Sequence, residues 1–419
     1  MKKMASEKPD KSMMKKSMTL MMALMVVSAT TAFAQDALVN EAKKSLASGN
    51  IKAAERILKP ALTSAKTRDK AAAWYLMSDI KYIQYEGIKI FQEKKDSFSM
   101  WQNAVESWQY AQKCNEFDQK SKQPRYRKSI IARFKDFGPQ LGQAGEYFRE
   151  HKDNANALKA YQAYLDLYDS PIFKYEKGMQ KEEIYHDVAY LAAYLSYQEH
   201  SYKQAIKFAE IAKQKPERSD DANDIIIFAL KDNCKNHNDS LAYRNYLKKL
   251  RKANVKEERY FNLLCDYYNS ASQTATGKAE KMAWLREEAV IDPNNKLVHA
   301  ILGEIMMNEN KWDEAIAAFD KAIAVDPTFI QCVFNCGCCY FNSAIELQDK
   351  LADEKGMISK TNLQKVKNLI SKSEPYFLKA RKLDPNQNTC NWAKLLSNVY
   401  KALGETAKEN EMNALIKRR

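Results

Sequence analysis

The sequence predicts an all-α protein built from consecutive helical hairpins. Its 419 residues include 11 glycines and 10 prolines, so turn-forming residues are scarce for a chain of this length. No alternating, valine-rich stretch indicates a β-strand. Small and large apolar residues instead recur at spacings of four and then three residues, which places them on one face of a helix.

Residues 1–34 form a separate segment. A lysine pair precedes an apolar run from Met18 to Ala29, and Ala32, Phe33 and Ala34 provide a small-x-small cleavage site. This order is typical of a secretory signal peptide, with the mature chain beginning at Gln35. A membrane anchor is the alternative, which the short apolar run disfavours. We therefore expect an exported protein, periplasmic or secreted, without an integral membrane segment after cleavage.

Residues 35–250 are expected to form about five N-terminal hairpins, with insertions at 85–99 and 170–180. The second helix of each of the first four hairpins carries three residues spaced about four and three apart. These triplets are Ala54, Leu58 and Ala61; Ala104, Trp108 and Ala111; Ala157, Tyr161 and Tyr164; and Ala205, Ala209 and Ala212. Small side chains at such positions let paired helices approach each other closely.

Residues 251–419 are expected to form the C-terminal hairpins, with a charged insertion at 347–367. Hairpins near 257–293 and 330–385 flank the clearest one, which is described next. The last predicted helix, residues 406–417, ends in charged residues. A polar outer face is what the terminal unit of a stacked array requires, so this helix is interpreted as a cap.

The stretch 296–327 has the clearest hairpin pattern. Helices are predicted over 297–308 and 312–325, and the second ends at a proline, which cannot continue a helix. The positions that carry the pattern resemble the tetratricopeptide repeat signature of L-G, then A-x3-F, then a closing proline. They are Leu302, Gly303, Ala315, Phe319, Ala322 and Pro327. His299 and Met306 depart from the Trp and Tyr of that signature. One hairpin cannot bury its own apolar face, so neighbours must stack on it.

The resemblance implies a right-handed superhelical solenoid of tetratricopeptide-type repeats, similar to the exported arrays of Bacteroidetes-type bacteria. In that family the first helices of the hairpins line a concave face, which binds peptide segments or partner helices. Tyrosine suits such a face because it combines a large contact area with a polar tip. Packing of the tyrosines against a neighbouring helix or loop is the alternative. The equivalent positions here are Tyr190, Tyr194, Tyr197, Glu304, Met307, Asn308, Phe334, Cys338 and Phe341.

Four of the eight cysteines form a cluster at Cys332, Cys336, Cys338 and Cys339. On a helix, the first, second and fourth of these share one face. Packing as small apolar residues is the favoured interpretation, with a disulfide after export or a metal site as alternatives. A disulfide within one helical turn is geometrically awkward, and no second Cys-x-x-Cys lies nearby. We therefore expect no metal and no cofactor.

The sequence predicts a non-catalytic scaffold in the cell envelope that binds a peptide or protein partner along the concave face. It has no Gly-rich phosphate loop and no G-x-S-x-G elbow, and its five histidines are scattered. A further hypothesis is an enzyme or glycan binder that uses the tyrosines. It requires a pocket with convergent acidic side chains, which the sequence does not supply. Nucleic acid is not an expected partner, because the chain is predicted to be exported and lacks an aromatic-basic recognition motif.

Charge supports one alternative function. Removing the six lysines and two acids of the segment 1–34 changes the formal net charge from +14 to +10. A basic balance outside the cytoplasm favours anionic partners. The alternative is therefore an envelope-surface protein whose basic faces dock to anionic lipid, glycan or an outer-membrane assembly.

Overall fold

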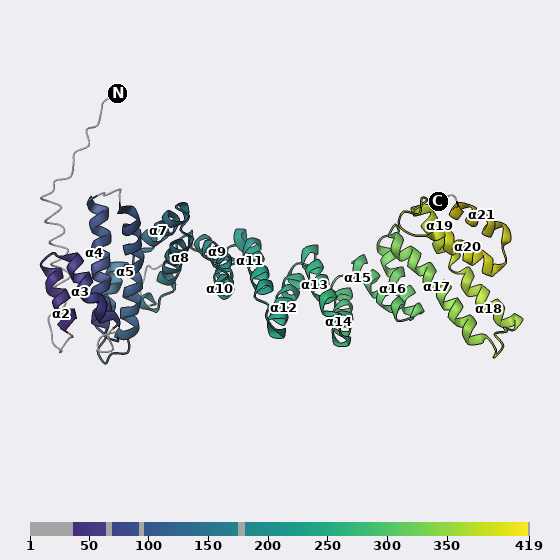
Figure 1. Ribbon diagram of the computed structural model, residues 1–419, viewed down its shortest axis with the longest axis horizontal. Helices are drawn as coiled ribbons and strands as arrows, with labels where there is room; N and C mark the ends of the chain where they lie inside the picture. Colours follow the sequence, from purple (N-terminus) through teal and green to yellow (C-terminus); the bar gives the residue numbers. More distant parts are fainter. Residues whose placement is uncertain (1–36, 64–68, 92–95, 175–180, 418–419) are drawn as a thin grey trace, which may run out of the picture. The chain divides into compact units, whose positions relative to one another are not determined.

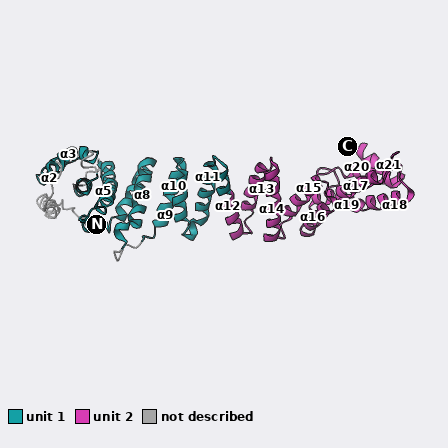
Figure 2. Cartoon of the chain, turned by 90° about the horizontal axis from the view of Figure 1, so that it is seen from below, with its two compact units in different colours: residues 1–243 teal, residues 244–419 magenta. Residues whose placement is uncertain are grey.

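The computed structural model describes residues 37–63, 69–91, 96–174 and 181–417, and within these ranges the chain is helical without β-strands (Figure 1). The predicted all-α class is confirmed. The chain divides into two compact units, residues 1–243 and 244–419 (Figure 2). The predicted signal peptide lies outside the described residues, as do positions 175–180 of the insertion expected at 170–180.

Unit 1 is built from antiparallel helix pairs. The closest pairs are α2 with α3, α4 with α5, α7 with α8, and α9 with α10. The elements are α2 (Ala37–Ala47), α3 (Ile51–Thr63), α4 (Ala71–Phe91), α5 (Ser97–Asp118), α6 (Arg127–Phe134), α7 (Gly138–Glu150), α8 (Asn154–Asp169), η3 (Pro171–Phe173), α9 (Tyr185–Gln198), α10 (Tyr202–Ala212), η4 (Pro216–Arg218) and α11 (Ser219–Asp232). Helix α12 (His237–Ala253) contains the boundary between the units.

Unit 2 repeats the same construction. Helix α13 pairs with α14, α15 with α16, α17 with α19, and α20 with α21. The elements are α13 (Glu258–Ala271), α14 (Ala275–Ile291), α15 (Lys296–Asn308), α16 (Trp312–Val325), α17 (Ile330–Leu351), α18 (Lys360–Ser371), α19 (Glu374–Leu383), α20 (Trp392–Leu403) and α21 (Thr406–Lys417).

A glycine that faces an aromatic ring sets the closest approach of paired helices. A Cβ atom added to Gly303 of α15 would lie 2.6 Å from the ring of Phe319 on α16, which is closer than packed carbon atoms come. The helices could not then keep their present separation. The arrangement recurs in three hairpins: Gly145 with Tyr161, Gly303 with Phe319, and Gly337 with Phe377.

The small and large residues of the triplets lie in the core. All three members are fully buried in the triplets that begin at Ala54, Ala104, Ala157 and Ala205. The corresponding residues of α16, at 315, 319 and 322, are also fully buried. Leu302 is half-buried on α15, and Pro327 is exposed just beyond the end of α16.

Helix α4 is longer than the sequence pattern suggests. It continues to Phe91, into the segment where a polar insertion is expected, and α5 begins at Ser97. The extension is held by Tyr85, which is buried with its ring centroid 5.5 Å from that of Phe137 and 6.3 Å from that of Trp101. Aromatic contacts from α5 and from the residue that precedes α7 therefore offset the polar residues around Tyr85.

The charged segment 347–367 is also largely helical. Helix α17 runs to Leu351, and the additional helix α18 packs against α17 and α20. Val366 and Ile370 of α18 are buried in the core cluster of unit 2, with Leu369 packed beside them. Their spacing of three and four residues gives α18 a narrow apolar stripe among many polar residues.

A buried lysine joins three helices of unit 1. The Lys81 Nζ atom of α4 lies 2.9 Å from Glu55 Oε1 of α3 and 2.9 Å from Glu106 Oε2 of α5. Gln84 also donates a hydrogen bond to Glu55. Burial acts to raise the pKa of Glu55, but the hydrogen bonds from Gln84 and Lys81 outweigh it and lower that pKa to about 2. The buried ion pair of Lys81 and Glu55 therefore depends on these hydrogen bonds.

None of the helices in the described ranges has the length and apolar character that a membrane crossing requires.

Candidate partner-binding site

Helices α9 and α11 pack against each other in unit 1. Their outer sides carry a set of residues that we call the α9–α11 face. Within each helix these residues are spaced three or four apart and so share one side. The opposite side of α9 is buried at Val188, Ala192 and Leu195, which leaves the aromatic side turned away from the hairpin core. The members of the α9–α11 face are Tyr190, Tyr194, Tyr197, Asp221, Asp224, Phe228 and Asp232.

Two rings on this face are about half exposed. Tyr194 exposes 44% of its surface and Phe228 exposes 51%. The Tyr194 hydroxyl accepts a hydrogen bond of 2.8 Å from the Gln198 amide, one turn further along α9. The Phe228 ring lies 6.4 Å from the ring of Tyr197, measured between centroids. Exposed aromatic area is thus present on both helices.

The hydroxyl of Tyr197 links the two helices. It donates a hydrogen bond of 2.7 Å to Asp232 Oδ2 of α11. This bond, assisted by partial burial, raises the pKa of Tyr197 to about 12. The phenol therefore stays protonated at neutral pH and holds the Asp232 carboxylate at the edge of the exposed rings.

The other end of the face is organised by an ion-pair cluster. The Arg218 guanidinium carbon lies 4.8 Å from the ring centroid of Tyr190, and Arg218 Nε lies 2.6 Å from Asp187 Oδ1. Lys215 Nζ lies 2.7 Å from the other Asp187 oxygen. Partial burial acts to raise the pKa of Asp187, but the hydrogen bonds from Lys215 and Arg218 prevail and lower it. Tyr190 is fixed by this cluster, with Arg218 against its ring.

The three predicted tyrosines therefore lie on one face but play different parts. Tyr194 presents the largest free area of the three, whereas Tyr190 and Tyr197 are anchored by Arg218 and Asp232. Phe228 was not predicted from the sequence. Its signal is nevertheless present in the chain, because Asp221, Asp224, Phe228 and Asp232 follow one side of a helix at spacings of three and four.

The predicted residues of unit 2 are less uniformly exposed. Glu304 and Asn308 of α15 are exposed, while Met307 packs against the cluster formed by α15, α16 and α17. Phe334 and Phe341 of α17 are half-buried against the C-terminal core cluster, and the Phe334 ring centroid lies 5.6 Å from that of Phe377. Both phenylalanines thus contribute to packing as well as to the helix surface.

The cysteine cluster lies mostly in the core of unit 2. Cys332, Cys336 and Cys339 are buried, Cys338 is half-buried, and all four are free thiols. Burial raises the pKa of Cys332 and of Cys339 to about 12, which disfavours the thiolate that metal binding and disulfide exchange require. Within the described ranges, no three His, Cys, Asp or Glu side chains are placed to hold a metal ion.

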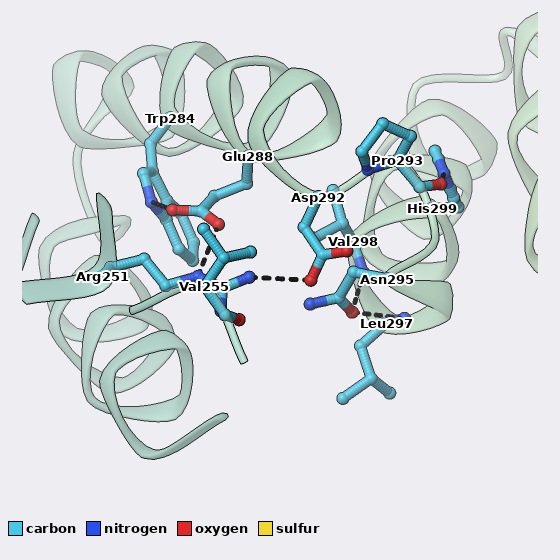
Figure 3. Close-up of polar contacts among 10 residues, drawn as sticks. All are labelled: Arg251, Val255, Trp284, Glu288, Asp292, Pro293, Asn295, Leu297, Val298 and His299. Carbon is cyan, nitrogen blue, oxygen red and sulfur yellow. Dashed lines mark hydrogen bonds and ion pairs between the residues drawn. The ribbon is translucent and has the colours of Figure 1, made fainter. Parts of the chain in front are cut away.

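A buried polar network ties α12 to α14 in unit 2 (Figure 3). Arg251 Nε donates to Glu288 Oε2 at 3.0 Å, and Arg251 Nη2 donates to Asp292 Oδ2 at 3.0 Å. The second oxygen of Glu288 accepts a bond of 3.2 Å from the Trp284 indole N–H, and the carbonyl of Val255 accepts from Arg251 Nη1. The side chains of Arg251 and Glu288 are 1% and 2% exposed. Each charge in this network has partners, so its role is to hold the helices together.

The adjoining junction between α14 and α15 is fixed by two contacts to the backbone. Asn295 caps α15 by accepting from the backbone N–H groups of Leu297 and Val298 at 3.1 and 3.4 Å. The ring Nε2 of His299 lies 2.7 Å from the carbonyl oxygen of Pro293 (Figure 3). His299 is therefore a buried junction residue rather than a solvent-facing acid or base.

Residues 297–329 match the family model described as tetratricopeptide repeat. A tetratricopeptide repeats protein from Bacteroides fragilis NCTC 9343 has a crystal structure that is 16% identical, covers 66% of this chain and 98% of that chain, and gives a TM-score of 0.31. The structure of YrrB, described as a tetratricopeptide repeat protein with an unusual peptide-binding site, is 16% identical, covers 62% of this chain and 93% of that chain, and gives a TM-score of 0.18. No curated protein sequence gives a significant match.

Proposed function

We propose that this chain, whose residues 297–329 match the tetratricopeptide repeat, is a non-catalytic scaffold whose α9–α11 face binds a protein or peptide partner. One observation carries the proposal. Tyr194 and Phe228 each expose about half of their surface on adjacent packed helices. At the edge of these rings, the hydroxyl of Tyr197 and the carboxylate of Asp232 supply polar contacts that fix the orientation of a bound segment.

The exposed rings are large enough to dominate binding. A large aromatic side chain buries about 150–250 Å², so covering the free half of each ring removes roughly 75–125 Å² from water. At about 25 cal/mol per Å², that is about 2–3 kcal/mol for each ring. Contributions of this size are typical of the few residues that dominate an interface. Because Tyr190 and Tyr197 are already held by Arg218 and Asp232, binding orders few additional side chains.

The proposed location is the cell envelope, in the periplasm or outside the cell. Its support is the signal-peptide pattern of the segment 1–34, which has a lysine pair, an apolar run and a small-x-small site.

The α9–α11 face offers rings, hydroxyls and carboxylates arranged along two helices, which suits contact with an extended or helical segment. The non-catalytic role is proposed because this face offers groups for contact with a segment of another chain.

Affinity capture from envelope extract tests this proposal. The bait is compared with the double variant Tyr194→Ala/Phe228→Ala, which removes both exposed rings without touching the hairpin core. We expect a specific protein partner to be retained by the unchanged bait and lost by the variant. Reconstitution with the purified partner then gives affinities, and the double variant should bind at least about a hundredfold more weakly.

The matched control is Phe98→Ala. Phe98 exposes 45% of its surface in unit 1 but lies on α5, outside the α9–α11 face. This variant should keep the partner, because removing a similarly exposed ring elsewhere leaves the site intact. If the Tyr194/Phe228 variant captures the same partner with unchanged affinity, the α9–α11 face is not the binding site.

Contact with an anionic envelope surface is the second candidate function. It is favoured by the formal net charge of +10 that remains once residues 1–34 are removed. Binding through dispersed surface lysines would disappear in about 1 M salt, where the Debye length falls to about 3 Å. Partner binding through the aromatic rings would persist in that salt.

A further inference from the structure

A basic cleft lies at one end of the α4–α5 hairpin in unit 1. It is lined by the start of α4, the end of α5 and the segment 119–126 that leads to α6. Its volume is about 950 Å³, which lies near the top of the usual range for small-ligand sites. The cleft shares no residue with the α9–α11 face, so it is a separate candidate site.

The wall formed by segment 119–126 is held in place by a buried carboxylate. Asp118 is 3% exposed, and its oxygens accept hydrogen bonds from the backbone N–H of Arg125 at 3.0 Å and of Tyr126 at 2.9 Å. The Tyr126 ring also stacks on Tyr75 of α4, with 4.6 Å between ring centroids. The cleft is therefore shaped before any ligand arrives, which lowers the entropy lost on binding.

Positive charge predominates along this cleft. The acids of its described lining are Asp69 and Asp118, and the Asp118 carboxylate is turned to the backbone N–H groups of its own segment. Lys70 immediately precedes α4 beside the exposed Asp69, and the other three cations come from the opposite wall, so most of the positive charge that a ligand meets comes from residues 120–125. The cations of the lining, all exposed, are Lys70, Lys120, Lys122 and Arg125.

Two of these cations already have neighbours within the chain. Arg125 Nη2 donates a hydrogen bond of 3.4 Å to Gln123 Oε1. Lys120 Nζ lies 3.3 Å from Glu116 Oε1, one turn earlier on α5, and the two side chains are 66% and 48% exposed. An exposed pair of this kind contributes about 0–1 kcal/mol, so Lys120 can turn from Glu116 to an anion in the cleft at little cost.

We propose that this cleft binds a ligand that carries two or more phosphate groups. Three of the four cations are lysines, whose compact ammonium groups bind phosphate as point charges, and the fourth is an arginine, whose guanidinium can bind phosphate through two hydrogen bonds. Three cations along one wall and Lys70 across from them favour a ligand with separated anionic groups over a single small ion. Both a soluble polyphosphate and the headgroups of an anionic membrane have this chemistry.

Calorimetric titration of the full chain with inorganic tripolyphosphate tests the proposal. The variant Lys70→Ala/Lys122→Ala removes one cation from each wall. The control Lys52→Ala/Lys203→Ala removes the same charge from exposed positions on α3 and α10. We expect saturable binding that weakens about tenfold or more in the cleft variant and stays within about twofold of the unchanged chain in the control. Equal melting temperatures establish that both variants fold.

Co-sedimentation with vesicles of equimolar phosphatidylglycerol and phosphatidylcholine identifies the source of the phosphate. Vesicle binding that is lost in the cleft variant, without tripolyphosphate binding, supports a membrane headgroup. Binding of tripolyphosphate alone, lost in the same variant, supports a soluble ligand, and loss of both supports a site that accepts either source. An equal loss in the cleft and control variants, or no binding of either probe, would overturn the proposal.

Discussion

Replacing Arg251 by alanine should lower the stability of unit 2 far more than replacing an exposed basic residue would. The substitution removes the donors to Glu288, Asp292 and the carbonyl of Val255. Glu288 is 2% exposed and would be left as a buried carboxylate without its cation, whereas Asp292 is 26% exposed and can regain water. Removing one partner of a buried pair costs about 3–5 kcal/mol, and we expect a loss in this range.

Hydrogen exchange measured by mass spectrometry is the appropriate assay, because it reports stability separately for each helix of a two-unit chain. At about 1.4 kcal/mol for each tenfold change, the protection factors of α14 amides should fall by roughly two to three and a half powers of ten. The fall is smaller for amides that exchange through global unfolding in the unchanged protein. Peptides from α2 to α5 in unit 1 should exchange as in the unchanged protein.

The matched control is the neighbouring residue. Lys252 Nζ lies 2.8 Å from Glu287 Oε1, but the two side chains are 57% and 34% exposed. An exposed pair of this kind contributes about 0–1 kcal/mol, so Lys252→Ala should change α14 protection less than about tenfold. Equal effects of Arg251→Ala and Lys252→Ala would refute the reasoning, since burial would then not decide the outcome.

Packing, charge and burial each give one more prediction. Gly303→Ala should destabilise the protein by about 1–3 kcal/mol in urea unfolding because its Cβ meets an aromatic ring, whereas Gly87→Ala, with nothing within 4 Å, should stabilise it by about 0.5–1 kcal/mol. The same sign for both would contradict the packing argument. The pKa of Glu55 is lowered to about 2, so its stabilising contribution is present above about pH 4.5 and is lost as the pH falls toward 2. Glu55→Gln should therefore flatten acid unfolding in that window, and Glu41→Gln, at an exposed site, should not. In native thiol labelling, the exposed Cys234 should react first, and early labelling of the buried cysteines would show that their core opens.

The hairpins were predictable because their signal is local. For the best hairpin, the expected bounds 297–308 start one position later than α15, and the expected bounds 312–325 coincide with α16. A glycine opposite a large side chain on the next helix of the same hairpin marks the helix contact directly in the sequence, as Gly303 and Phe319 do.

Contacts between distant residues were not predictable in this way. Arg251 and Glu288 are 37 residues apart, and each resembles an ordinary surface charge when its own segment is considered alone. The extension of α4 depends on the contact of Tyr85 with Phe137, a residue from beyond the next two helices. Phe228 lies in a hairpin with a weak repeat pattern. The aspartates four residues before and after it mark its side of α11, but the approach of its ring to Tyr197 depends on the packing of α9 against α11.

Photo-cross-linking in intact cells tests the central claim most directly. A photoreactive phenylalanine analogue is placed at position 194, on the α9–α11 face, or at position 98, which is similarly exposed on α5. We predict that position 194 yields one discrete cross-linked protein and that position 98 does not. Cross-linking of the same protein from position 98 but not from position 194 would contradict the assignment of this face as the partner-binding surface.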